Sequence, residues 1–396
     1  MLLTKTTSAL AAIACTGLTF AASSAAAPPS RGSVISVTAV QHLSARQVRT
    51  ALTAQHFDSS SVRFGVDAYR IRYRTITPKG TPTSASGLLV LPRTHHLRPG
   101  TVSYTHGTMA TKAYAPSVDD GGKSLEAMTF GGAGYAAVAP DYLGLGRGPG
   151  PHPFMHVRSE VSASLDLLTA ARTVAASHGR RLDPRILVTG FSQGGDVAVA
   201  LARAIQNGAD PRLRLRALAP ISGPYELLRA ELPASFDGRV APQNAVYYLG
   251  YLLTAWNPIY HLYDNPGEAF QAPYDRTIEQ LYDGFHSNEQ IVTGLPEAPS
   301  RLLTPRFLHL LQHPTGRFLA AVTENDRLCD WAPRVPVRLF GARDDDHVAI
   351  ANSQLCQVAF AAHRVDAPLV DVGPVGHMQS NVKGLPQILR WFERPS

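Results

Sequence analysis

Residues 185–205 read RILVTGFSQGGDVAVALARAI and decide the fold. The stretch opens with a β-branched, apolar run that is typical of a buried strand, and it closes with apolar residues at helical spacing. Between them stands GFSQGG, a G-x-S-x-G pattern on a strand-to-helix turn. Gly190 and Gly194 supply the small neighbours that such a sharp turn needs. We therefore expect the hydroxyl of Ser192 to be exposed at a helix N-terminus, where backbone amides stabilise negative charge.

The rest of the chain alternates short apolar runs with helical stretches, which is typical of an α/β sheet covered by helices on both faces. The clearest helical period lies between Ser159 and Ser177. We predict a mostly parallel sheet of eight strands, at residues 68–75, 85–91, 101–104, 135–139, 186–190, 217–221, 337–341 and 369–372.

More than a hundred residues between the strands at 217–221 and 337–341 lack this rhythm. We interpret residues 224–318 as an inserted, mainly helical cap that divides a core of residues 28–223 and 319–396. The cap is rich in aromatic residues, which either line an acyl pocket or form the cap's own core: Tyr247, Tyr248, Tyr251, Trp256, Tyr260 and Tyr263.

A serine hydroxyl is a weak nucleophile and needs a base that is itself oriented by an acid. On a G-x-S-x-G turn of this kind the chain order is serine, acid, histidine. Three histidines follow the candidate acids. His347 is nearly adjacent to those acids, and His363 lies in a predicted helix. His377, in the loop after the last predicted strand, is therefore the expected base.

The acid stands in the run GARDDDHV at 341–348, directly after a predicted strand. Counting forward from Gly341 favours Asp344, whereas counting back from Val348 favours Asp345, our preferred choice. In a third interpretation Asp344, Asp346 and His347 bind a metal ion, although such clusters at strand ends are more often solvated loops.

The oxyanion of acyl transfer needs two backbone donors. One is expected from Gln193, the residue after the nucleophile, and the other from the loop after an early strand. That loop reads YTHGT at 104–108, and the amide of Thr108 is our candidate. Gly107 gives the backbone freedom, and His106 is interpreted as structural.

Residues 1–27 have one lysine, an apolar stretch and a run of small residues, in the order of a secretory signal peptide. An uncleaved membrane anchor and lipidation at Cys15 are the alternatives; no later segment is apolar for long enough to span a membrane. Export to an extracellular or periplasmic space predicts a disulfide between the remaining cysteines, Cys329 and Cys356, rather than two buried thiols.

The chain has 396 residues and a net charge of +7, and its basic residues are scattered. The densest run, Arg212 to Arg216, alternates with leucines and indicates a strand with one solvated face. There is no basic stripe with interleaved aromatic residues, so nucleic acid is not an expected partner.

The chain resembles the secretory lipase-like α/β hydrolases, which include the yeast lipase A type and many bacterial esterases. The likeness lies in YRIRY at 69–73, HGT at 106–108, PDYLGLG at 140–146, GFSQGG at 190–195, DWAP at 330–333 and GH at 376–377. The resemblance implies an α/β-hydrolase fold, hydrolysis of a small-molecule or lipid carboxylic ester, a helical cap and no cofactor. It also favours Asp345, since the family's acid usually stands three residues before the valine that Val348 matches. Ala349 departs from the proline common there.

Two other functions compete with ester hydrolysis. A serine exopeptidase on the same fold would use the same tetrahedral chemistry, with Glu226, Glu231 or Asp237 available to bind a substrate amino terminus. A non-catalytic binding module has no need of a serine, an acid and a histidine in this order, and the sequence disfavours it.

Overall fold

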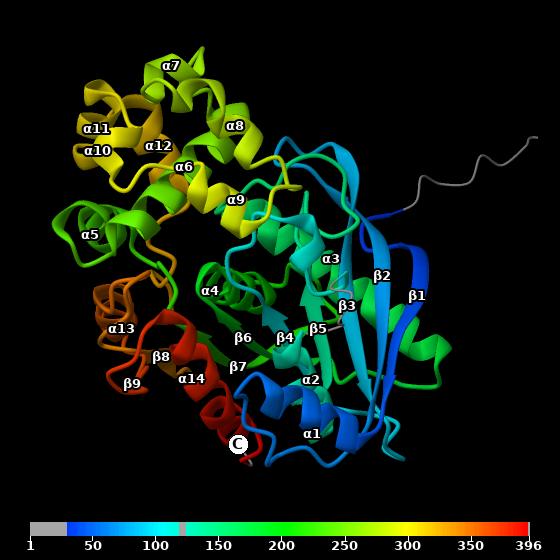
Figure 1. The fold of residues 1–396 in the computed structure, drawn as a ribbon. Helices are drawn as coiled ribbons and strands as arrows, with labels where there is room; N and C mark the ends of the chain where they lie inside the picture. Colours follow the sequence, from blue (N-terminus) through cyan, green and yellow to red (C-terminus); the bar gives the residue numbers. More distant parts are fainter. Residues whose placement is uncertain (1–29, 119–123, 395–396) are drawn as a thin grey trace, which may run out of the picture.

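A computed structural model describes residues 30–118 and 124–394. The predicted signal peptide at 1–27 lies outside them. Nine strands form one sheet in the order β1-β2-β3-β5-β4-β6-β7-β8-β9 (Figure 1). Strands β1 to β3 and the β3–β5 pair are antiparallel, and the pairs from β5 through β4 to β9 are parallel. The α/β-hydrolase fold is thereby confirmed.

The predicted strands all correspond to strands of the sheet, whose bounds are β2 Val66–Ile76, β3 Pro82–Pro92, β4 Thr101–Thr105, β5 Ala136–Pro140, β6 Arg185–Phe191, β7 Arg214–Ile221, β8 Leu339–Gly341 and β9 Leu369–Asp371. The predicted number of eight was wrong, because β1 (Val34–Leu43) adds a ninth. This strand pairs only with β2 and is mostly exposed. Its run VISVTAV is rich in β-branched residues and is strand-like in sequence, although Ile35 and Val37 are exposed at this edge of the sheet.

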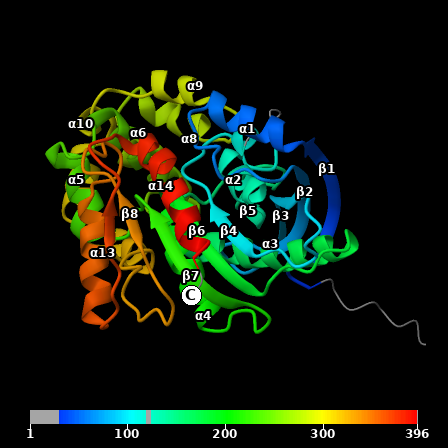
Figure 2. The ribbon, with the colours of Figure 1, turned by 90° about the horizontal axis from the view of Figure 1, so that it is seen from below.

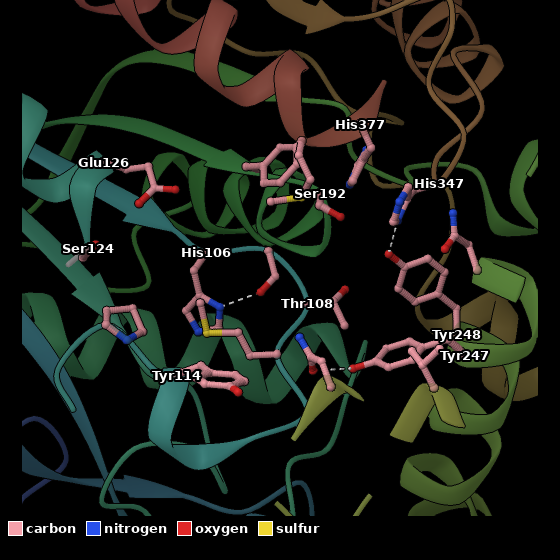
Figure 3. Close-up of a pocket in the computed structure, with 18 of the residues that line it drawn as sticks. His106, Thr108, Tyr114, Ser124, Glu126, Ser192, Tyr247, Tyr248, His347 and His377 are labelled. Carbon is pink, nitrogen blue, oxygen red and sulfur yellow. Dashed lines mark hydrogen bonds between the residues drawn. The ribbon is translucent and has the colours of Figure 1, made fainter. Parts of the chain in front are cut away.

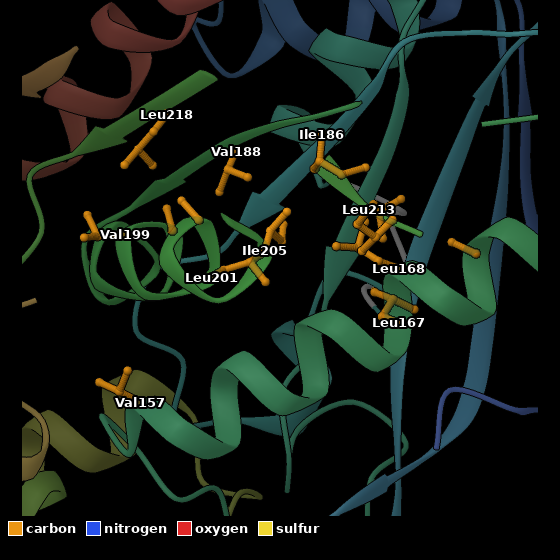
Figure 4. Close-up of a cluster of buried hydrophobic side chains, with 14 of the residues drawn as sticks. Val157, Leu167, Leu168, Ile186, Val188, Val199, Leu201, Ile205, Leu213 and Leu218 are labelled. Atoms are coloured by element: carbon orange, nitrogen blue, oxygen red, sulfur yellow. The ribbon is translucent and has the colours of Figure 1, made fainter. Parts of the chain in front are cut away.

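Two apolar clusters cover the two faces of the sheet. Neighbouring residues of β6 point to opposite faces, since Ile186 and Val188 belong to one cluster and Leu187 to the other. Helices α3 (Val157–Ser177) and α4 (Gln193–Gln206) build the first cluster (Figure 4) together with α13 (Ala351–Ala362). The opposite face is covered by α1 Ala45–Ala54, α2 Leu125–Ala133 and α14 His377–Phe392 (Figure 2).

The chain between β7 and β8 is helical and has its own apolar cluster around Trp256 and Phe307. Its elements are η2 Leu227–Glu231, α5 Leu232–Asp237, α6 Pro242–Tyr260, α7 Pro266–Ala269, η3 Tyr274–Arg276, α8 Ile278–Leu281, α9 Asn288–Thr293, α10 Pro299–Leu302, α11 Pro305–Gln312 and α12 Gly316–Glu324. Helix α12 packs on this cluster and continues past residue 318. The cap boundaries at 224 and 318 stay a prediction.

Cys329 and Cys356 form a disulfide, with their Cα atoms 5.2 Å apart. The bond joins the segment after α12 to helix α13, and both cysteines are buried in the first cluster. Such a bond is compatible with an exported protein. Across the described residues, none of the helices has both the length and the apolar character that crossing a membrane requires.

Because β4, β6, β8 and β9 are parallel, the loops at their carboxyl ends meet at one edge of the sheet. The short helix η1 (Lys112–Tyr114) follows the first of these loops. Ligands of open α/β sheets bind at this edge, so the site is sought there.

Candidate active site

Ser192 stands on the turn between β6 and α4 with a φ of 58° and a ψ of −126°. Few residues other than glycine adopt a positive φ, and such strain persists only where surrounding structure holds it. The amide of Ser192 donates to the carbonyl oxygen of Ile221 at 2.9 Å, which ties the turn to the end of β7. The turn thus presents the serine at the N-terminus of α4.

The two motif glycines are required by close packing. A Cβ on Gly190 would lie 2.0 Å from Oγ1 of Thr105, and one on Gly194 would lie 2.0 Å from the carbonyl oxygen of the same threonine. Gly107, in the loop after β4, is also crowded: its Cβ would approach that of Ser192 to 3.3 Å. This loop and the serine turn therefore pack together only because these positions lack side chains.

His377, the first residue of α14, lies beside Asp345 from the loop after β8. Nδ1 of His377 is 2.8 Å from Oδ2 of Asp345, and both side chains are buried. The other carboxylate oxygen accepts hydrogen bonds from the amides of His347 (3.0 Å) and Val348 (2.9 Å). Asp344 is exposed. The geometry therefore joins Asp345, and not Asp344, to the expected base.

A cavity of about 380 Å³ contains Ser192 and His377 in its wall, and Figure 3 shows these two side chains next to each other. Nε2 of His377 is buried and has no hydrogen-bond partner among the described residues. The ring of Phe191 packs on the imidazole at 4.5 Å between centroids. The Nε2 nitrogen of a ring held by Asp345 and Phe191 is thus left, in the described part of the chain, without a hydrogen-bond partner at the cavity that Ser192 also lines.

His347 is not joined to the serine but stacks on His377, with ring centroids 4.8 Å apart and an interplanar angle of 13°. Its Nδ1 is 2.7 Å from the hydroxyl of Tyr248 on α6 (Figure 3). Burial and the neighbouring His377 lower the pKa of His347. A neutral ring from the acid loop therefore supports the base and connects it to the helical segment. His363 ends α13 and contacts Asp330 instead.

The oxyanion candidates Thr108 and Gln193 both line a second, smaller cavity next to Ser192. Two buried side chains contact the side chain of Gln193. Its Nε2 donates to Oε1 of Glu160 at 2.5 Å and lies 3.0 Å from Nε2 of His152. Burial raises the pKa of Glu160 to about 8 and lowers that of His152 to about 3. Both groups are therefore neutral at neutral pH, which suits this dry position.

His106 behaves as the structural residue expected from the sequence. Its Nδ1 contacts the carbonyl oxygen of Gly107 at 2.7 Å, and its ring packs against Tyr142. Burial lowers its pKa to about 4. Sequence patterns do not mark Glu160 or His152, because both contact Gln193 from distant segments of the chain. The buried Asp196 has no local motif either, and neither of its carboxylate oxygens has a hydrogen-bond partner among the described residues.

The aromatic residues of the helical segment divide between the two proposed roles. Tyr247 and Tyr248 line the cavity at Ser192. Tyr251, Trp256 and Tyr263 are buried in the segment's own cluster. The aromatic residues are therefore divided between the cavity wall and the segment's own core, and contact with an acyl group stays a prediction.

In the part of the chain that the structure describes, no group of three or more histidine, cysteine or acidic side chains is arranged to hold a metal ion. The arrangement of the described side chains therefore does not support the alternative in which Asp344, Asp346 and His347 bind a metal ion.

The sheet order and the helices on both of its faces define the α/β-hydrolase fold. The chain is similar to an esterase from Xanthomonas oryzae that degrades the rice cell wall, with 26% identity, a TM-score of 0.82 and coverage of 92% of this chain and 98% of that one. It is also similar to a protein of Legionella pneumophila assigned as a hydrolase, with 26% identity, a TM-score of 0.84 and coverage of 91% and 97%.

Candida antarctica lipase A shares the fold at 16% identity, with a TM-score of 0.66 and coverage of 92% of this chain and 82% of the lipase. No protein-family model and no curated protein sequence matches the chain. The lipase shows the shared fold alone. The esterase and the hydrolase at 26% identity confirm by structure the resemblance to esterase-like α/β hydrolases, and they support a carboxylic ester hydrolase.

Proposed function

We propose that this chain is an exported carboxylic ester hydrolase in which Ser192 is the nucleophile, His377 the general base and Asp345 the supporting acid. The observation that carries the proposal is the 2.8 Å contact of Asp345 with His377, which lines the same cavity as Ser192. The substrate class is a small-molecule or lipid ester.

In the first half of the reaction, Nε2 of His377 takes the hydroxyl proton as Oγ of Ser192 attacks the ester carbonyl. The carboxylate of Asp345 holds the ring by its Nδ1 and stabilises the imidazolium that forms. The imidazolium then gives its proton to the departing alcohol. An acyl group remains on Ser192.

In the second half, water attacks the acyl group with His377 again as the base, and the carboxylic acid leaves. Both halves pass through a tetrahedral oxyanion. The amides of Gln193 and Thr108 are assigned to it, because both residues line the cavity next to Ser192.

The direct test replaces the nucleophile. Ser192→Ala should abolish hydrolysis of p-nitrophenyl acetate and labelling by a fluorophosphonate probe. Ser177→Ala, at an exposed serine at the end of α3, is the control and should keep both. Labelling of the Ser192→Ala protein at the wild-type level would sink the assignment.

A serine exopeptidase is tested in the same assay with aminoacyl anilides. Two of the acids considered for binding an amino terminus have other partners: Glu226 contacts Arg229 at 2.9 Å and Asp237 contacts Arg239 at 2.7 Å. Glu231 lines the small cavity, but burial raises its pKa to about 8, so it is not the ionised partner that an ammonium group needs at neutral pH. We expect esters to be cleaved and the anilides to be left intact.

Export is tested by N-terminal sequencing of the protein recovered from outside the producing cells. A first residue from 26 to 28 is expected for a cleaved signal peptide. A retained Met1 would contradict export by this route.

A further inference from the structure

The small cavity beside Ser192 differs from the large one in size and lining. It has a volume of about 60 Å³, against about 380 Å³ for the large cavity. Most of its wall is apolar, with side chains from α6, η2, α5 and the segment before α3: Phe154, Met155, Leu227, Leu232, Leu249 and Leu252. The large cavity carries more polar groups, including Gln243, Asn244 and Asn288.

The positions of the proposed catalytic residues indicate which cavity receives the acyl portion of an ester and which receives the alcohol portion. Among the described residues, His377 lines the large cavity and not the small one, whereas Gln193 lines only the small one. The base must return its proton to the departing alcohol oxygen, so the alcohol portion lies on the side of His377. The acyl portion then extends the other way, past Gln193, since Ser192 and Thr108 line both cavities.

We propose that the small cavity is the acyl subsite and that it admits short, apolar acyl groups from acetyl to butyryl. This inference rests on the proposed ester hydrolysis. The cavity has about a sixth of the volume of the large one. A longer alkyl chain must therefore either extend out of it or move the packed side chains of its wall.

Glu231 is the unusual member of this wall. Its Oε2 accepts a hydrogen bond from Nδ2 of Asn352 at 2.7 Å. Burial, aided by the charge of Asp345, raises its pKa, so the group is uncharged at neutral pH. An uncharged carboxyl is tolerated beside an acyl chain. Each methylene added to that chain, however, gains less binding free energy against this carboxyl than it would against a leucine side chain. It therefore adds to the preference for short chains.

The test compares kcat/KM for p-nitrophenyl acetate, butyrate, hexanoate and octanoate. The wild-type protein should prefer acetate and butyrate over octanoate by at least about tenfold. Leu249→Ala, which enlarges the small cavity, should raise the octanoate-to-acetate ratio about tenfold or more. Leu252→Trp, which fills it, should lose butyrate while keeping acetate. Val292→Ala is the matched truncation in the large cavity and should leave both acyl ratios unchanged.

A wild-type preference for octanoate would overturn the assignment. So would an acyl profile that responds to Val292→Ala and not to Leu249→Ala or Leu252→Trp, because the two cavities would then have exchanged roles. A different outcome is a wild-type protein that hydrolyses none of these esters and is not labelled by the fluorophosphonate. That result would refute the proposed ester hydrolase itself and not only the acyl subsite. Thermal unfolding of each variant confirms that a changed ratio comes from a folded protein.

Discussion

Nδ1 of His377 lies 2.8 Å from Oδ2 of Asp345, although the two residues come from loops after different strands. Two backbone amides hold the other carboxylate oxygen, so the acid is oriented before any substrate arrives. Asp344, its neighbour in the sequence, is exposed to solvent. Substituting each aspartate separately tests which of the two supports His377.

Asp345→Asn should lower kcat by about 10⁴-fold, because an amide cannot stabilise the imidazolium and favours the wrong tautomer of the histidine. Asp344→Asn carries the same chemical change on an exposed side chain and should keep kcat within about twofold. Steady-state hydrolysis of p-nitrophenyl acetate measures both. A larger loss in the Asp344 variant would reverse the assignment of the acid.

Gly107→Ala should lower kcat by about 10²- to 10³-fold, the usual cost of losing one oxyanion donor. The added Cβ would stand 3.2 Å from the ring of Phe191 and 3.3 Å from Cβ of Ser192, and we expect the tight fit to displace the neighbouring Thr108 amide. Gly267→Ala meets Asn265 at the same 3.3 Å, lines neither cavity, and serves as the control. Wild-type kcat in the Gly107 variant would remove Thr108 from the oxyanion site.

Glu160 makes the stability of the fold depend on pH. Its pKa is raised from 4.5 to about 8 by burial, so the folded protein keeps a proton that the unfolded chain releases between these values. The folded state is favoured below pH 4.5, and this advantage is lost as the pH rises toward 8. The side chain in Glu160→Gln is neutral at every pH. The Tm of this variant should therefore fall less from pH 5 to pH 8 than the Tm of the wild type.

Calorimetry at both pH values tests this expectation. Glu289→Gln, at an exposed position in α9, is the control and should follow the wild-type curve. Parallel curves for the wild type and the Glu160 variant would show that the buried carboxyl does not titrate with folding.

The double variant Cys329→Ser/Cys356→Ser should lose about 3 kcal/mol of unfolding free energy, because the unfolded chain regains the freedom of the closed loop. The bond spans 27 residues and links the segment before β8 to α13. Neither cysteine lines the cavities at Ser192, so kcat should change little in the folded variant. Urea unfolding with and without reductant measures the effect, and equal midpoints for the wild type in both conditions would contradict it.

The strands of the core were predictable because each is buried on one or both faces, which leaves an apolar pattern in the chain. Strand β1 was not predicted, although its β-branched run VISVTAV is typical of a strand; its apolar side chains Ile35 and Val37 stay exposed at the sheet edge instead of joining the core. The serine turn was also predictable, since Gly190 and Gly194 are local requirements of its backbone. The motif order likewise indicated His377, and the structure sets its ring against Asp345.

The sequence by itself determined the fold class, the strained serine turn and the order of the expected catalytic residues. These depend on hydrophobic periodicity and on steric demands between near neighbours in the chain. Only the tertiary structure decided which aspartate contacts His377, that His347 stacks on it, and that Ser192 stands between a large cavity and a small apolar one. Those relationships join residues from separate loops and helices, whose distances no local pattern encodes.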